Sequence, residues 1–110
     1  MKARVVVEAG VCGFQTRISA DSDDDQSVVL EIDSDCPKAT AFGRAVMGQG
    51  PVDGYAEIGA GADGVVLTAG RQHLQGCCAG CVVPAGVFKA VQVAAAVALP
   101  KDVSIAIGRA

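Results

Sequence analysis

The sequence predicts a single α+β domain in which helices pack on one face of a four-stranded sheet. Three observations predict it: strand-like runs follow one another near the N-terminus, helical patterns fill the middle, and an alternating apolar run closes the chain. The chain has 110 residues, of which 51% are hydrophobic, and this is enough for one buried core. We therefore expect one domain over residues 1–110, with the element order β-β-β-α-α-α-β.

The first three strands are expected to form two consecutive hairpins. Residues 4–9 are rich in valine, as in a buried strand. Residues 14–20 and 26–33 alternate apolar and polar side chains, which is the period of a half-exposed strand. Two glycines around Cys12 predict the first turn, and the acidic residues 21–25 predict the second.

Proline and capping residues mark the helices that follow. Ser34 or Asp35 is expected to cap a helix over residues 39–47, with Pro37 in its first turn. A short helical segment is expected over residues 52–58.

The middle of the chain is less regular. Residues 59–64 match G-x-G-x-x-G, but a dinucleotide site needs a preceding strand and a later acidic residue, and both are missing here. This stretch is interpreted as a connector. Residues 65–74 suit a helix or a strand, and Asp63 as a possible cap favours a helix.

The end of the chain holds the clearest helix and the last predicted strand. Residues 84–99 carry an apolar stripe at helical spacing, with Pro84 in the first turn and Pro100 after the end. Residues 103–107 alternate, with Val103, Ile105 and Ile107 on one face, and predict the fourth strand of the sheet.

Charge and hydropathy argue against several classes of function. The net charge of −3 offers no basic surface for nucleic acid or for an anionic membrane. Glu8 interrupts the N-terminal apolar run too early for a signal peptide, and no uninterrupted apolar run approaches the length of a membrane span. We expect a cytoplasmic protein without nucleic-acid or membrane partners.

The five cysteines are the strongest functional signal. In a reducing compartment they indicate metal or redox chemistry rather than a disulfide framework. Cys77, Cys78 and Cys81 lie together in Gln-Gly-Cys-Cys-Ala-Gly-Cys, where Cys78 and Cys81 form a Cys-x-x-Cys that suits one metal ion or one disulfide. Cys12 and Cys36 lie far away along the chain.

The two hairpins should bring Cys12 and Cys36 to one end of the sheet. Cys12 follows the first strand and Cys36 follows the third, which must run in the same direction. The Cys-rich segment joins them there if the helix that follows it leads into a last strand parallel to the first. All five cysteines would then cluster.

The local sequence also suits thiolate ligands. Cys36 and Cys81 lie at or just before predicted helix N-termini, where backbone N–H groups stabilise negative charge. His73 is a further ligand candidate, although a lone histidine is more often an ordinary surface or core residue. No nucleophile elbow and no paired carboxylates in an apolar setting are visible, so the sequence favours a binding domain over an enzyme.

Several blocks resemble a family of small uncharacterised proteins found mainly in anaerobic prokaryotes. They are residues 7–14, residues 34–37, the Cys-rich segment up to Pro84, and residues 89–103. The resemblance implies four recurring cysteines and no established activity. Carried over by position, these are Cys12, Cys36, Cys81 and one of Cys77 or Cys78.

Three functions are consistent with these residues. The preferred one is a four-thiolate metal-binding domain with an iron–sulfur cluster, used for electron transfer, cluster carriage or sensing with a protein redox or cluster-transfer partner. One alternative is a structural zinc domain that holds its metal with four cysteines and acts as a scaffold. The other is a thiol–disulfide oxidoreductase that uses Cys78 and Cys81.

Overall fold

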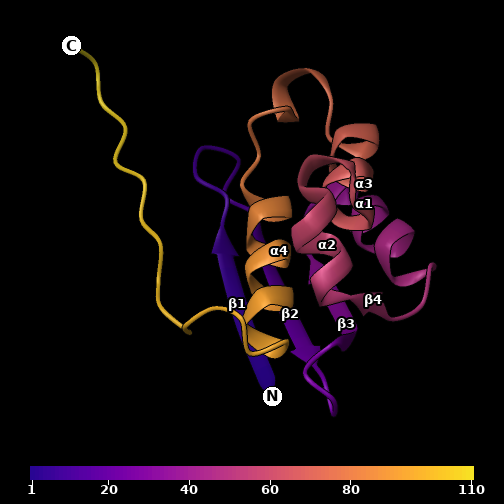
Figure 1. Ribbon diagram of the computed structural model, residues 1–110. Coiled ribbons are helices and arrows are strands. Elements are labelled where there is room, and N and C mark those ends of the chain that lie inside the picture. The colour runs from indigo at the N-terminus through magenta and orange to yellow at the C-terminus, as the bar shows by residue number, and fades with distance from the viewer.

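A computed structural model describes residues 1–110 as an α+β fold with an antiparallel four-stranded sheet in the order β1-β2-β3-β4. Figure 1 shows the helices gathered on one face of this sheet. The expected fold class is confirmed. The strands are β1 Lys2–Glu8, β2 Gln15–Asp21, β3 Ser27–Ser34 and β4 Val52–Asp53.

The first three strands form the two hairpins that the alternating pattern predicts. Val5 pairs with Ile18, and Ile18 pairs with Ile32, so the three side chains share one face of the sheet. That face is the core face, where Ile18 is 1% exposed. The other face carries mostly polar side chains and no helix covers it (Figure 1).

Four α-helices and two short 3-10 turns complete the fold. Helix α4 lies along β1 and β2, and α1 packs between β3 and α3. The helices are α1 Pro37–Met47, α2 Gly54–Ala60, α3 Val65–His73 and α4 Val83–Ala94, and the 3-10 turns are η1 Gly61–Asp63 and η2 Gly76–Cys78.

The fourth strand of the sheet is not the one expected from the sequence. Residues 103–107 form no strand, and β4 pairs instead with β3, placing Val52 opposite Val28. Both valines are buried, so this apolar cross-strand pair helps to hold the short strand in place. The helix expected over residues 52–58 begins only at Gly54. The element order β-β-β-α-α-α-β is therefore corrected to β-β-β-α-β-α-α-α.

Helix α4 is the central core helix. Val87 and Val91 are fully buried, and Gly86 lies so close to β1 that an added Cβ would be 2.6 Å from Cγ2 of Val7. The helix ends at Ala94 and not near residue 99, because Ala96 takes a left-handed conformation with φ of 62°. Residues 95–110 form no helix or strand, and Figure 1 shows the last of them running away from the body.

The 19-residue stretch from Gly76 to Ala94 is long and apolar enough to cross a membrane, with a mean hydropathy of 1.6. Its helical part is α4, whose buried side chains face the sheet. A core helix meets the same criterion, so this length and composition do not distinguish the two settings.

Candidate functional site

The structure places all five cysteines at one end of the sheet, where β1 and β3 finish. Cys12 lies in the turn between β1 and β2, and Cys36 follows β3 directly. The Cys-rich segment joins them because α4 begins at this end. Its first turns lie beside Val7, and its C-terminal end lies beside Gly54, which follows β4 at the opposite end.

This shared end arises without the parallel last strand that the sequence argument required. The direction of α4 is set by packing rather than by a strand after it. Gly86 allows the helix to lie directly on β1, and Gly70 of α3 lies against the ring of Pro84, which fixes where α4 starts.

Cys12 lies at the tip of an exposed turn. The turn closes with a hydrogen bond from the N–H of Gly13 to the carbonyl oxygen of Gly10 at 2.9 Å. Both glycines have positive φ, 86° at Gly10 and 72° at Gly13, which explains why the turn contains them. The Cys12 side chain is exposed and free.

Cys36 is itself the N-cap residue of α1, so the expected caps Ser34 and Asp35 are wrong. Ser34 contributes indirectly, because its hydroxyl accepts a hydrogen bond from the N–H of Cys36 at 3.1 Å. Thr40 donates its hydroxyl to the carbonyl oxygen of Cys36 at 2.9 Å. The thiol is free and half-buried against the core, at the N-terminus of α1.

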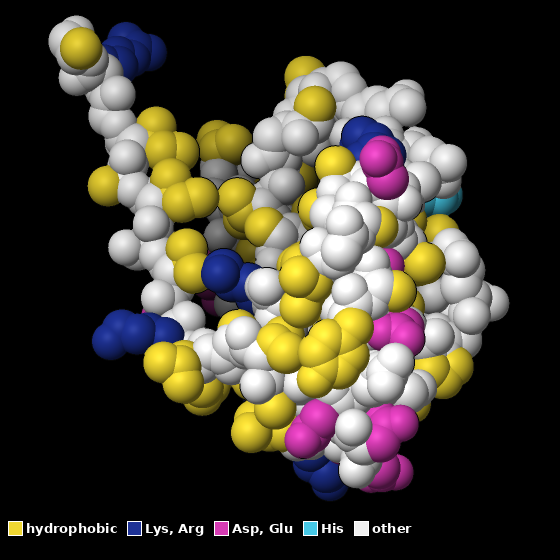
Figure 2. All heavy atoms as spheres, viewed as in Figure 1, with side chains coloured by type: hydrophobic (Ala, Val, Ile, Leu, Met, Phe, Trp, Pro, Cys, Tyr) yellow, Lys and Arg dark blue, Asp and Glu magenta, His cyan; other side chains and the backbone are white.

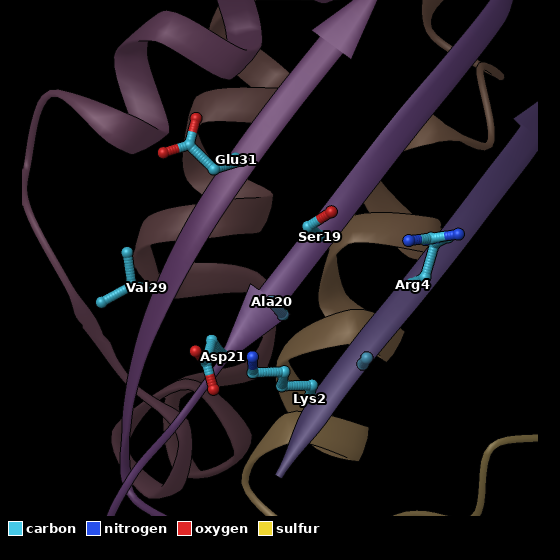
Figure 3. Close-up of a pocket in the computed structure, with 8 residues that line it drawn as sticks. Lys2, Arg4, Ser19, Ala20, Asp21, Val29 and Glu31 are labelled. Carbon is cyan, nitrogen blue, oxygen red and sulfur yellow. The ribbon is translucent and has the colours of Figure 1, made fainter.

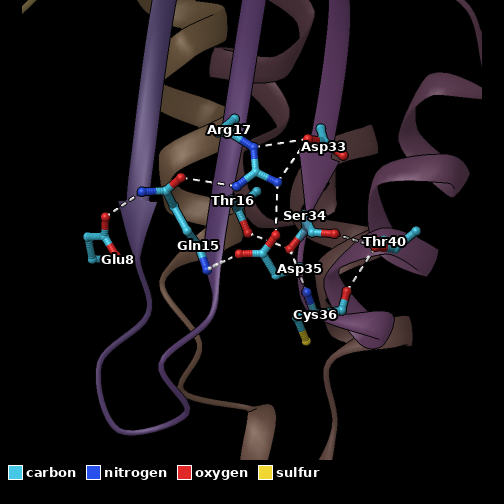
Figure 4. A network of polar contacts seen from close by, with 9 residues as sticks. All are labelled: Glu8, Gln15, Thr16, Arg17, Asp33, Ser34, Asp35, Cys36 and Thr40. Atoms are coloured by element: carbon cyan, nitrogen blue, oxygen red, sulfur yellow. Dashed lines mark hydrogen bonds and ion pairs between the residues drawn. The ribbon is translucent and has the colours of Figure 1, made fainter.

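A polar network on the open face of the sheet lies next to Cys36 (Figure 4). Arg17 forms ion pairs with Asp33 at 2.8 Å and with Asp35 at 3.1 Å. Hydrogen bonds from the Arg17 side chain and from the backbone N–H of Gln15 lower the pKa of Asp35 below its ordinary value of 3.8. Hydrogen bonds to the same two aspartates raise the pKa of Arg17, and the bond to Asp35 has the larger effect. This network ties β2 to the segment that carries Cys36.

The Cys-rich segment is a series of tight turns. The N–H of Cys81 donates to the carbonyl oxygen of Cys78 at 3.1 Å, and the N–H of Cys78 donates to that of Gln75 at 3.3 Å. Cys77 is exposed, whereas Cys78 and Cys81 are half-buried and pack against the core. Lys38 of α1 reaches the carbonyl oxygen of Gln75 at 3.5 Å, which links this segment to the helix that Cys36 caps.

The shared end does not bring the ligand candidates together as a preformed metal site. No three Cys, His, Asp or Glu side chains lie close enough together to hold a metal ion. All five thiols are free, and His73 lies in the last turn of α3. The topology therefore delivers the cysteines to one region, but no three of them converge on one point.

Two shallow hollows are found on the surface, one of them beside the Cys-rich segment. One, of about 670 Å³, lies over β1, β2 and β3 and carries both basic and acidic side chains, among them Arg4 and Glu31 (Figure 3). The other, of about 580 Å³, lies between α3 and the start of α4 and has Cys81 in its wall. Neither holds a set of groups arranged for acid–base or nucleophilic catalysis.

Glu57 is a buried carboxylate that the sequence does not single out. It is 3% exposed, and its carboxylate accepts the N–H groups of Val65 and Val66 at 2.9 and 2.8 Å. It therefore caps α3 in place of Asp63, which makes no such bond. The signal in the sequence is weak, because the acceptor lies eight residues before the first donor.

The fold and these residues define a small α+β domain with a cysteine-bearing end. Residues 3–107 match a family of unknown function, DUF6951, and the chain belongs to that family. No curated protein and no solved structure matches the chain.

Proposed function

We propose that the cysteine-bearing end is a thiolate metal site in a small cytoplasmic protein. Its ligands are Cys12, Cys36, Cys81 and one of Cys77 or Cys78, which are also the four recurring cysteines that the resemblance to anaerobic prokaryotic proteins implies. The observation that supports this most strongly is the placement of three separate cysteine-bearing segments at one end of the sheet.

The donor set fits a soft metal or a cluster. Four thiolates suit zinc and iron–sulfur centres alike. The four ligands come from the β1–β2 turn, the α1 cap and the segment before α4. These are loops and termini, which rearrange more readily than strands.

Metal binding would have to close the loops. The exposed Cys12 turn, with glycine on either side, must move its thiol towards Cys36 and Cys81. Such closure is usual, because a preformed site rarely exists before the metal binds and binding energy then contributes to folding. The half-buried Cys36 and Cys81 already pack against the core and form the fixed side of the site, together with Cys78 where that residue is the fourth ligand.

An iron–sulfur cluster is the preferred occupant, for electron transfer, cluster carriage or sensing with a protein redox or cluster-transfer partner. A structural zinc ion is the alternative, and the domain would then act as a scaffold. Anaerobic purification followed by an absorption spectrum and metal analysis distinguishes them. Brown protein that contains iron and sulfide supports the cluster, and colourless protein with about one zinc per chain supports the scaffold.

Single serine variants sharpen this test. Cys12→Ser and Cys36→Ser should each lower the metal content of the purified protein, since each removes one of four ligands. Comparison of Cys77→Ser with Cys78→Ser identifies the remaining ligand, and the other variant serves as its control. The metal site would be overturned if the native protein is metal-free and colourless, and if a variant with all five cysteines replaced by serine is as stable as the native protein.

A thiol–disulfide oxidoreductase is a second candidate because of the turn formed by Cys78 and Cys81. The 3.1 Å hydrogen bond between their backbones closes a turn, and such turns bring the two Cα atoms within about 7 Å, inside the reach of a disulfide. In that reaction the two thiols become a disulfide as a partner disulfide is reduced to two thiols. A Cys81→Ser variant trapping a mixed disulfide through Cys78, or the reverse, would support it.

A further inference from the structure

The C-terminal tail, residues 101–110, has the pattern of a strand but no strand partner. Val103, Ile105 and Ile107 alternate with small residues, and their exposed fractions are 61%, 66% and 92%. Figure 2 shows apolar side chains along the tail, separated from the body by a hollow. Apolar side chains in a row at this spacing are typical of a strand that covers a core.

Strand β1 has a free edge that matches this need. The sheet order leaves β1 outermost, and hydrogen bonds from Ala9 to Phe14 and from Ser22 to Met1 show which of its residues bond to β2. Because antiparallel bonding alternates, the N–H and C=O groups of the intervening residues point away from β2. These residues are Lys2, Arg4, Val6 and Glu8.

Charge selects the direction in which the tail would pair. Asp102 precedes the tail's apolar residues and lies on the opposite face from them, which in the sheet is the open face that Lys2, Arg4 and Glu8 share. A parallel pairing places Asp102 near the basic start of β1. An antiparallel pairing would place it near Glu8, a like charge, which is unfavourable.

The connector after α4 leaves the tail unpaired with its own β1. Ala96 has a φ of 62°, and the N–H groups of Val97 and Lys101 are held by the carbonyl oxygens of Gln92 and Leu99 at 2.9 Å each. These local bonds hold the connector in a conformation in which the tail stands apart from its own sheet (Figure 1). A short connector that holds a strand away from its own sheet favours exchange between identical chains.

We propose that residues 103–107 of one chain add as a parallel fifth strand to the free edge of β1 in a second copy, and that the exchange is reciprocal. Each tail then covers Ala3 and Val5 of the partner, which are only partly buried on the helix side of β1. Pairing also satisfies the free backbone groups of that edge, as in other cases of strand addition. The proposal does not depend on the cysteines.

The test is the mass of the full-length protein by light scattering, compared with Ile105→Lys and its control Ser104→Lys. The native chain should be a dimer. Ile105→Lys should weaken dimerisation at least tenfold, because one apolar side chain per tail no longer packs. Ser104→Lys, on the opposite face of the tail, should leave the dimer intact. Circular dichroism should show the same fold in all three.

Charge reversal checks the direction. Asp102→Lys should weaken the dimer, and adding Arg4→Glu to the same chain should restore it. A native chain that is monomeric overturns the proposal, whether or not hydrogen exchange shows its tail to be protected by its own sheet. A dimer that survives Ile105→Lys, or that loses stability equally with Ser104→Lys, overturns it as well.

Discussion

The carboxylate of Glu57, near the middle of α2, accepts the backbone N–H of Val66 at 2.8 Å and so begins a different helix, α3. The same carboxylate accepts the N–H of Val65, and Gly64 leaves room for it, because an added Cβ there would lie 2.6 Å from Oε2 of Glu57. A single buried side chain therefore holds α2 and α3 in a fixed relation.

Glu57→Ala should lower the free energy of unfolding by about 3 kcal/mol, because two helix N–H donors would lose their acceptor in a buried site. Glu57→Gln should lose less, since its amide oxygen still accepts one bond. Urea unfolding measures both. Equal stability of Glu57→Ala and the native protein would show that α3 does not depend on this cap.

Gly86→Ala should destabilise the protein by about 1–3 kcal/mol, because the added methyl group would press on Val7 and push α4 off β1. Gly59→Ala is a matched control in α2, where an added Cβ meets nothing within 4 Å. The control should be neutral or slightly stabilising, because alanine favours the helix. Thermal unfolding compares the two variants, and similar losses in both would contradict the close packing of α4 on β1.

The thiols should differ in reactivity as their burial differs. Cys12 and Cys77 are exposed, whereas Cys36, Cys78 and Cys81 are half-buried, so a thiol reagent should modify two residues of the metal-free protein before the rest. Mass spectrometry of peptides identifies them. If a metal site forms as proposed, metal should protect Cys12, together with Cys77 or Cys78. Continued fast modification of Cys12 in the metal-loaded protein would remove it from the ligand set.

Stability should fall in acid because three aspartates are more acidic in the folded protein than in the unfolded chain. The pKa values of Asp24, Asp35 and Asp53 all lie below 3.8, mainly through hydrogen bonds from the backbone of Ser27, the side chain of Arg17 and the backbone of Ala56, respectively. In each case the unfolded chain binds its proton first as the pH falls.

The stabilisation is therefore complete above about pH 5 and is lost as the pH falls through the lower folded values. The melting temperature should change little between pH 7 and pH 5 through these groups and should decrease below pH 4. Asp35→Asn should reduce this decrease, and Asp23→Asn, whose side chain makes no hydrogen bond in the structure, serves as the control. An unchanged acid profile in Asp35→Asn would contradict the role of Arg17.

The hairpins could be predicted because their information is local. The alternation of apolar and polar residues over 14–20 and 26–33 predicts which side chains face the core. The glycines beside Cys12 predict where the chain turns. The placement of Cys12 and Cys36 at one sheet end follows from these two facts. The helix after Pro37 was also predicted, although Cys36 and not Ser34 or Asp35 caps it.

The fourth strand could not be predicted, because an alternating pattern does not indicate which strand of the sheet a segment will pair with. Residues 103–107 have the better strand pattern, yet Val52 takes the place because Val28 lies opposite it and both can be buried. The cap by Glu57 depends in the same way on a packing arrangement between two helices. The distances between the cysteine sulfur atoms depend on loop conformations, about which spacing along the chain carries no information.

The contact between α4 and β1 joins the first and the last element of the chain, and this has a consequence for the order of folding. Strands β1, β2 and β3 need only short loops to pair, so they should assemble early. Helix α4 can dock only after the chain has been synthesised to about Ala94. Cys12 and Cys36 should therefore come close together first, on the two hairpins that form early. The Cys-rich segment joins them only in the last folding step, when α4 docks. A metal or cluster delivered during translation would meet an incomplete set of thiols until that step is over.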